Sequence, residues 1–183
     1  MQWPSTRVTH VGLSVTDIDR YIDFGVNALG MKVMKRAAGR FATLSFGYQH
    51  HDIALLPVPP GTPKAHGAGL HHICFDLGNY QNWVLAFGRL VDAGVRVDRV
   101  TDHRTGVGIY FSDPEGNQFE FWYEAFSSME EAIENGRLMS EEFEENYVGY
   151  PVDQAQLYRD YQAMKARCDE APAASPAREL EPA

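Results

Sequence analysis

Two histidines and one glutamate, His10, His72 and Glu120, are the residues of this 183-residue chain whose types and positions best suit metal chemistry. Glu120 lies in the apolar run Phe119–Tyr123, where burying an unpaired carboxylate is costly, so it needs a partner of opposite charge. Two imidazoles and one carboxylate leave open coordination positions and suit non-haem Fe(II), although Mn(II) or zinc can also occupy such a set. Taken singly, a histidine is more often an ordinary strand residue and a glutamate a surface ion pair.

An internal repeat in the sequence favours the metal-ligand interpretation over these ordinary structural ones. Thr9–Val15 aligns with His71–Leu77 at an offset of 72 − 10 = 62 residues. Both segments alternate like β-strands, whose successive side chains point to opposite faces. The alternation places His10 and His72 on open sheet faces and His71 on the buried face. It therefore selects His72 as the second ligand, unless the register is shifted by one residue.

Each copy continues as a helix and three strands, so a βαβββ unit occurs twice. We expect an α+β fold in which the two modules pair into a metal-holding β cup, followed by C-terminal helices. The expected helices span 17–29, 81–93, 128–136 and 155–166, the first two ending at Gly30 and Gly94, and the expected later strands span 31–34, 41–46 and 52–56, then 95–97, 108–111 and 118–123. The expected divisions are an arm at 1–6, modules at 7–57 and 69–124 around a proline-rich linker at 58–68, a helical extension at 125–168 and a disordered tail at 169–183.

Composition narrows the function classes. A net charge of −9 without an evident basic cluster argues against a nucleic-acid partner and favours a small-molecule substrate. Two cysteines, Cys74 and Cys168, are too few for a disulfide framework and are typical of a reducing compartment. The chain begins with no signal-like segment and contains no apolar stretch long enough to span a membrane, so we expect a cytoplasmic protein with no membrane partner.

The segments Thr9–Val15, Leu70–Phe75 and Asp113–Glu120 together resemble the vicinal oxygen chelate superfamily over about residues 7–124. That superfamily includes glyoxalases, epimerases, resistance enzymes and extradiol dioxygenases. The resemblance implies paired βαβββ modules that hold a divalent metal through His10, His72 and Glu120. It does not fix the reaction, because one scaffold hosts several chemistries.

Further segments resemble one-domain type I extradiol dioxygenases, which are similar to catechol 2,3-dioxygenases. His50–Leu55 is similar to the segment that carries an acid-base histidine, and this match gives that role to His51. Ile109–Asn117 is similar to the stretch whose tyrosine binds the substrate or oxygen, here Tyr110. His103 resembles a further active-site histidine, although the loop to Tyr110 is two residues shorter here.

The resemblance implies ring opening of a catechol by O2 with Fe(II) as the metal and Mn(II) as an alternative, in a homodimer or larger homo-oligomer. The alternatives are a metal-dependent isomerase, epimerase, lyase or thiol transferase on the same fold. A protein that only binds an aromatic compound is a third reading. Trp122, Phe46 and Trp83 either line the pocket or fill the core.

Overall fold

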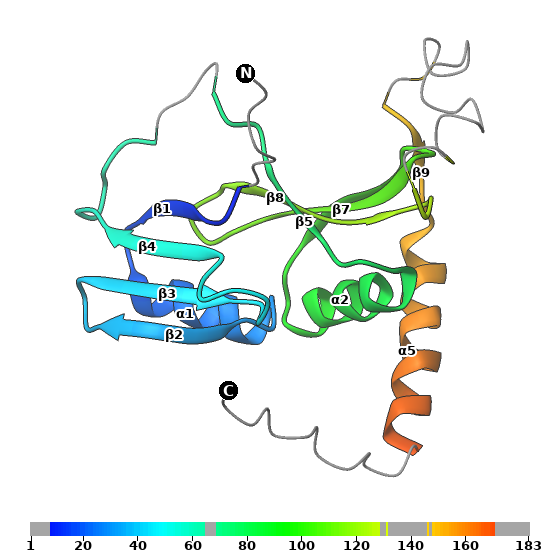
Figure 1. The fold of residues 1–183 in the computed structure, drawn as a ribbon, viewed down its shortest axis with the longest axis horizontal. Coiled ribbons are helices and arrows are strands. Elements are labelled where there is room, and N and C mark those ends of the chain that lie inside the picture. Colours follow the sequence, from blue (N-terminus) through cyan, green and yellow to red (C-terminus); the bar gives the residue numbers. More distant parts are fainter. Residues whose placement is uncertain (1–7, 65–68, 129–130, 132–145, 147, 171–183) are drawn as a thin grey trace, which may run out of the picture.

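The computed structural model describes residues 8–64, 69–128, 131, 146 and 148–170, and its elements repeat one βαβββ order twice. In Figure 1, α1 lies against the first sheet, α2 against the second, and α5 runs beside α2. The first module contains β1 (Val11–Val15), α1 (Ile18–Asn27), β2 (Lys32–Ala37), β3 (Phe41–Ser45) and β4 (Ile53–Pro57); the second contains β5 (Ile73–Asp76), α2 (Tyr80–Asp92), β6 (Val97–Asp102), β7 (Gly106–Ser112) and β8 (Gln118–Glu124); β9 (Tyr150–Pro151) and α5 (Gln154–Glu170) follow.

The first sheet has the strand order β1-β4-β3-β2, in which β1 and β4 are parallel and the other neighbours antiparallel. Helix α1 begins after Asp17, whose side chain accepts a hydrogen bond from the Arg20 backbone N–H and so caps the helix. Gly30 follows the helix with a φ of 77°, the left-handed conformation that we expected there. Buried and exposed residues alternate along most of β1, which confirms the expected strand period.

The second sheet has the order β5-β8-β7-β6-β9, and β5 is again parallel to the last strand of its module, β8. Asn79 caps α2 by accepting a hydrogen bond from the Asn82 backbone N–H. The indole N–H of Trp83 donates to the backbone carbonyl of Phe121 at 3.1 Å, which fastens α2 to β8. The shared topology confirms the repeat and the α+β fold, and the two sheets are not closed into a barrel.

Polar and aromatic contacts join the two modules. The Tyr21 hydroxyl of α1 donates to Asp113 Oδ2 at 2.9 Å in a buried setting, and burial followed by the Asp113 charge raises the pKa of Tyr21. Both the backbone N–H and the hydroxyl of Thr16 donate to Glu115 Oε1, at 2.8 and 2.9 Å. The turn that contains Asp113 and Glu115 therefore fixes β1 and α1 against the second module.

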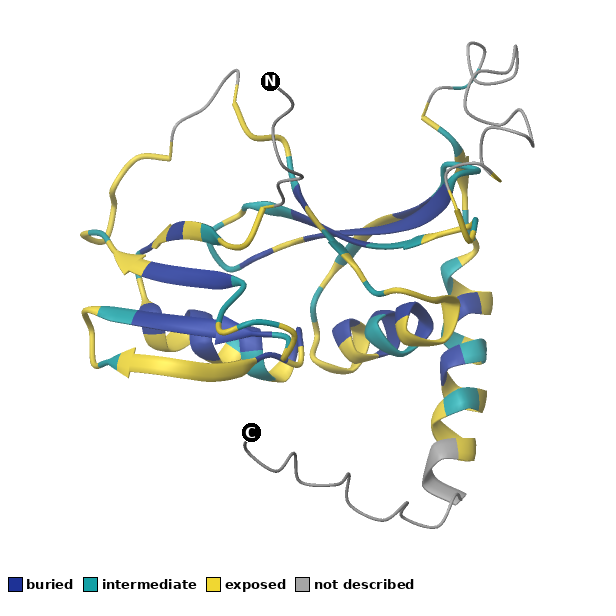
Figure 2. Ribbon diagram, in the orientation of Figure 1, coloured by how far each residue is buried: buried dark blue, intermediate teal, exposed yellow. Residues whose placement is uncertain are grey.

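Buried residues gather in β3, β4 and β7 and on the sheet-facing sides of the helices, whereas β2 is an exposed strand (Figure 2). Helix α5 adds Leu157 and Tyr161 to the core. The ring of Tyr161 lies so close to Gly88 that no Cβ fits there, so glycine at this position of α2 lets α5 pack. No helix within the described ranges is both long and apolar enough to cross a membrane.

Several local expectations are wrong. Strand β6 begins at Val97 rather than at residue 95, because the Val95 N–H still donates to the Leu90 carbonyl at the end of α2. His71 is exposed rather than buried, because β5 begins only at Ile73. Strand β9 was not expected. The expected arm at 1–6, nearly all of the helix at 128–136 and residues 171–183 of the expected tail lie outside the described residues, and α5 itself continues to residue 170.

Candidate metal centre and catalytic site

His72 and Glu120 form one polar pair on the second sheet. The parallel register of β5 and β8 pairs Cys74 with Glu120, and His72 lies just before β5. His72 Nε2 is 2.9 Å from Glu120 Oε2, and Glu120 is only 4% exposed. Its other oxygen, Oε1, is buried without a hydrogen-bond partner in the described part of the chain. A buried carboxylate oxygen without a partner is energetically costly, and a bound cation or a hydrogen-bond donor would remove that cost.

Gly108 on β7 leaves space for that carboxylate. A Cβ at Gly108 would collide with Glu120 Oε1 and would also press on the ring of Tyr110. The residue has no positive φ, so its glycine is explained by this close approach rather than by backbone conformation. The backbone of β7 thus forms one wall of the space into which Glu120 points.

Tyr110 and His103 form a second pair beside the first. His103 Nε2 is 2.9 Å from the Tyr110 hydroxyl, and the Tyr110 ring centre lies 5.7 Å from that of His72. Burial and the neighbouring Glu120 carboxylate raise the pKa of Tyr110, while burial lowers the pKa of His103, and the positive charge of Arg99 acts in the same direction. The shorter loop before Tyr110 therefore still brings His103 to it.

The first-module histidines gather separately. The rings of His10 and His51 lie 4.4 Å apart, and the nitrogens of His50 and His51 lie 2.9 Å apart. Partial desolvation, together with the His50 and His10 rings, lowers the pKa of His51. Asp52 holds the turn by accepting hydrogen bonds from the Phe46 N–H and from the Gln49 side chain.

The two groups do not merge as the side chains stand. Among the described residues, no three histidine, cysteine, aspartate or glutamate side chains are placed to hold one ion. The structure pairs His72 with Glu120 and His103 with Tyr110. The expected third ligand, His10, lies beside His51 instead. The three-ligand set therefore remains a prediction, of which the chain has assembled the His72–Glu120 pair.

Sequence reasoning did not identify two residues that lie beside Glu120, Cys74 and Gly108. Cys74 lies on the open face beside Glu120, and burial followed by the Glu120 charge raises the pKa of its thiol. Gly108 could have been found by counting two residues back from Tyr110 along the strand. Of the three undecided aromatic residues, Trp83 is buried in the core, Phe46 contacts Phe75 and Phe121 at the junction of the modules, and Trp122 lies 5.7 Å from His103 between ring centres.

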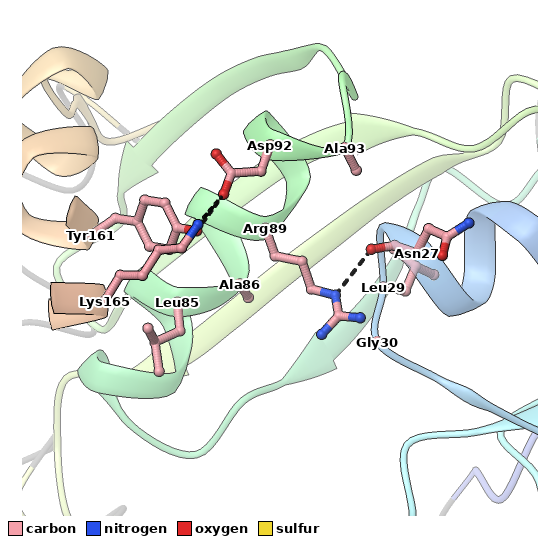
Figure 3. Close-up of a pocket in the computed structure, with 10 residues that line it drawn as sticks. All are labelled: Asn27, Leu29, Gly30, Leu85, Ala86, Arg89, Asp92, Ala93, Tyr161 and Lys165. Atoms are coloured by element: carbon pink, nitrogen blue, oxygen red, sulfur yellow. Dashed lines mark hydrogen bonds and ion pairs between the residues drawn. The ribbon is translucent and has the colours of Figure 1, made fainter. Parts of the chain in front are cut away.

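Two hollows lie away from the His72–Glu120 pair. One of about 740 Å³ is on the helical side, where Arg89 donates to the Asn27 carbonyl and Asp92 is paired with Lys165 (Figure 3). Arg89 already donates to backbone carbonyls and Asp92 is paired with Lys165, so the charged groups of the helical hollow have partners where α1, α2 and α5 pack. The other, of about 400 Å³, lies between Ser14 on the open face of β1 and Lys64 of the linker.

The family comparison fits this architecture. The model of the Glyoxalase/Bleomycin resistance protein/Dioxygenase superfamily matches residues 7–121, which is more than half of the chain. The chain belongs to this superfamily.

The chain is also similar to individual proteins of known name and to solved structures. Biphenyl-2,3-diol 1,2-dioxygenase 2 of Rhodococcus globerulus is 26% identical over 151 residues, which cover 80% of this chain and 77% of that protein. Catechol-2,3-dioxygenase of Bacillus subtilis (strain 168) is 28% identical over 119 residues, 62% of this chain and 41% of that protein. The crystal structure of lactoylglutathione lyase from Agrobacterium tumefaciens has a TM-score of 0.53 at 17% identity, covering 66% of this chain and 96% of that one, and shows a shared fold alone.

Proposed function

We propose that this protein is an extradiol dioxygenase that opens the ring of a catechol with O2 and uses Fe(II). The observation that carries the proposal is the buried Glu120, which is paired with His72 through one oxygen and has its second oxygen unpartnered, directly beside the Tyr110–His103 pair. The curated dioxygenases to which the chain is similar support this choice among the chemistries of the superfamily.

The donor set fits a divalent ion. One imidazole nitrogen and one carboxylate oxygen already meet, and His10 would be the third ligand, which completes the facial set of two histidines and one carboxylate. Fe(II) suits this set, and Mn(II) is the alternative. When bound, the ion would supply adjacent coordination positions for the catechol oxygens and O2 and a path for electrons between them.

The chain's own residues bind, orient and move protons. Tyr110, held by His103, would donate a hydrogen bond to a catechol oxygen and so fix the ring over the sheet. His51 lies in the first module beside His10, where its imidazole would accept one catechol proton and return a proton later in the reaction. Two different modules would thus supply the hydrogen-bond donor and the acid-base group.

A redox-inert reaction on the same ligands is the second candidate. Its support is the fold shared with a lactoylglutathione lyase, since imidazole and carboxylate ligands serve zinc as well as iron. An isomerase, lyase or transferase of this kind would work with zinc and would consume no O2.

The deciding experiment is anaerobic reconstitution with Fe(II), followed by measurement of O2 uptake and visible absorbance with a panel of catechols. One O2 consumed per catechol, with both oxygen atoms in a yellow hydroxymuconic semialdehyde, is the expected result. Zinc-loaded protein and Fe(II)-treated Glu120→Gln protein are the controls, and both should be inactive. A tightly bound metal with no O2 uptake on any catechol would reject the dioxygenase and favour the redox-inert reaction.

A further inference from the structure

Four residues form one row across the open face of the second sheet. The β6–β7 register pairs Arg99 with Tyr110, the β7–β8 register pairs Tyr110 with Glu120, and the β5–β8 register pairs Cys74 with Glu120. Side chains that are paired in this way share a face of the sheet. Arg99 therefore projects on the same side as the proposed metal ligand, two strands away from it.

Arg99 is a cation without a counter-ion in this row. Its guanidinium carbon lies 3.9 Å from the centre of the Tyr110 ring. Within the described ranges the guanidinium makes no hydrogen bond or ion pair, whereas the neighbouring Arg96 is paired with Asp98 at 2.6 Å. Stacking on the aromatic face holds the guanidinium in place and leaves its N–H donors available to a ligand.

We propose that Arg99 binds a carboxylate on the substrate, so that the preferred substrates are catechols that carry an acidic side chain. This inference rests on the proposed function for the position of the two catechol oxygens. Strands in a sheet are about 4.8 Å apart, so the backbones of Arg99 and Glu120 are roughly 10 Å apart. A catechol whose oxygens lie beside Glu120 and whose ring extends over the intervening Tyr110 side chain would bring a carboxylate substituent to Arg99.

The charge and geometry of the guanidinium both favour a carboxylate. A guanidinium can bind both oxygens of a carboxylate through two parallel hydrogen bonds, which fixes the orientation of the ring as well as its affinity. The chain carries a net charge of −9, so an acidic substrate is repelled by the protein as a whole and depends on a local cation. Arg99 provides that cation on the same sheet face as the site.

The test compares 3,4-dihydroxyphenylacetate with its methyl ester and with 4-methylcatechol in the Fe(II)-loaded protein. Arg99→Gln should lower kcat/KM for the acid by about 10- to 100-fold, mainly through KM, and change it by less than about twofold for the two neutral substrates. Arg99→Lys should recover part of the loss because the charge remains. Arg96→Gln, which removes an arginine already paired with Asp98, should behave as wild type.

Three other outcomes would be decisive. An equal loss on acidic and neutral substrates would make Arg99 only a support for the Tyr110 ring, and turnover of neutral catechols without any preference for the acid would equally reject the inference. Anaerobic binding of the acid and of the ester, measured by calorimetry, tests the carboxylate site separately from the proposed dioxygenase activity. Arg99-dependent binding of the acid without O2 uptake would keep the carboxylate site and reject the dioxygenase.

Discussion

The two modules have the same topology but contribute differently to the site. In the second module, short polar contacts join His72 to Glu120 and His103 to Tyr110, and Glu120 is buried within the sheet. In the first module, the ring of His51 makes a tilted contact with His10, which precedes β1, and an edge-to-face contact with His50 in the turn before β4. Strand register therefore positions Glu120 and Tyr110 in the second module, whereas His72, His103 and the first-module histidines lie outside the strands.

The strand registers show where the two modules differ. Cys74 pairs with Glu120 in the second module, and its counterpart Gly12 pairs with Ala54 in the first. Ala54 therefore stands where the second module has its carboxylate. Thr43, which pairs with Ala54, stands in the same way where the second module has Tyr110. A histidine therefore precedes the first strand of both modules, whereas the carboxylate is present in only one.

The largest effect is expected at the assembled half. Glu120→Gln removes the only carboxylate of the proposed ligand set, so metal affinity should fall by more than the roughly 10- to 100-fold that an outer hydrogen-bond partner is worth. The metal-free protein should unfold at the same or a higher temperature, because a buried oxygen without a partner loses its charge. Metal titration and calorimetry measure the two effects. A destabilised protein with unchanged metal affinity would make Glu120 a structural residue.

The first-module half should matter for proton transfer. His51→Ala is expected to lower kcat by about 10² to 10⁴-fold with metal content unchanged, because it removes the proposed acid-base imidazole. His50→Ala is the matched control, since it removes an adjacent exposed imidazole, and it should retain kcat within about threefold. Full turnover by the His51 variant, or the larger loss in the His50 variant, would exclude this assignment.

A smaller effect is expected at the junction that holds the halves together. Tyr21→Phe removes a buried hydrogen bond to Asp113 and should lower the free energy of unfolding by about 1.5 to 3 kcal/mol in urea denaturation. Tyr158→Phe, which removes an exposed hydroxyl contact with Asp92, should cost less. Because the pKa of Tyr21 is raised on folding, its stabilisation is complete below pH about 10 and is lost above it. Equal losses of unfolding free energy in both variants would show that the Tyr21–Asp113 hydrogen bond contributes no more to stability than an exposed one.

Sequence alone was a better guide to the strands than to the side chains between them. Period-two alternation placed Glu120 on a strand position that the structure preserves, whereas His10 and His72 each lie one residue before the strand that was expected to contain them. It could not locate His71, which precedes β5, nor the meeting of His51 with His10, because segments outside strands have no fixed period. The role proposed for Arg99 depends on the β6–β7 register, and β6 was expected too early in the chain.

Anaerobic Fe(II) titration of wild type, His10→Ala and His50→Ala tests most directly whether both halves form one metal centre. Wild type and His50→Ala should each bind one ion per chain with similar affinity. His10→Ala should bind far more weakly, because it would hold the ion through His72 and Glu120 alone. Wild-type affinity in the His10 variant would contradict the account, and would confine the metal centre to the second module.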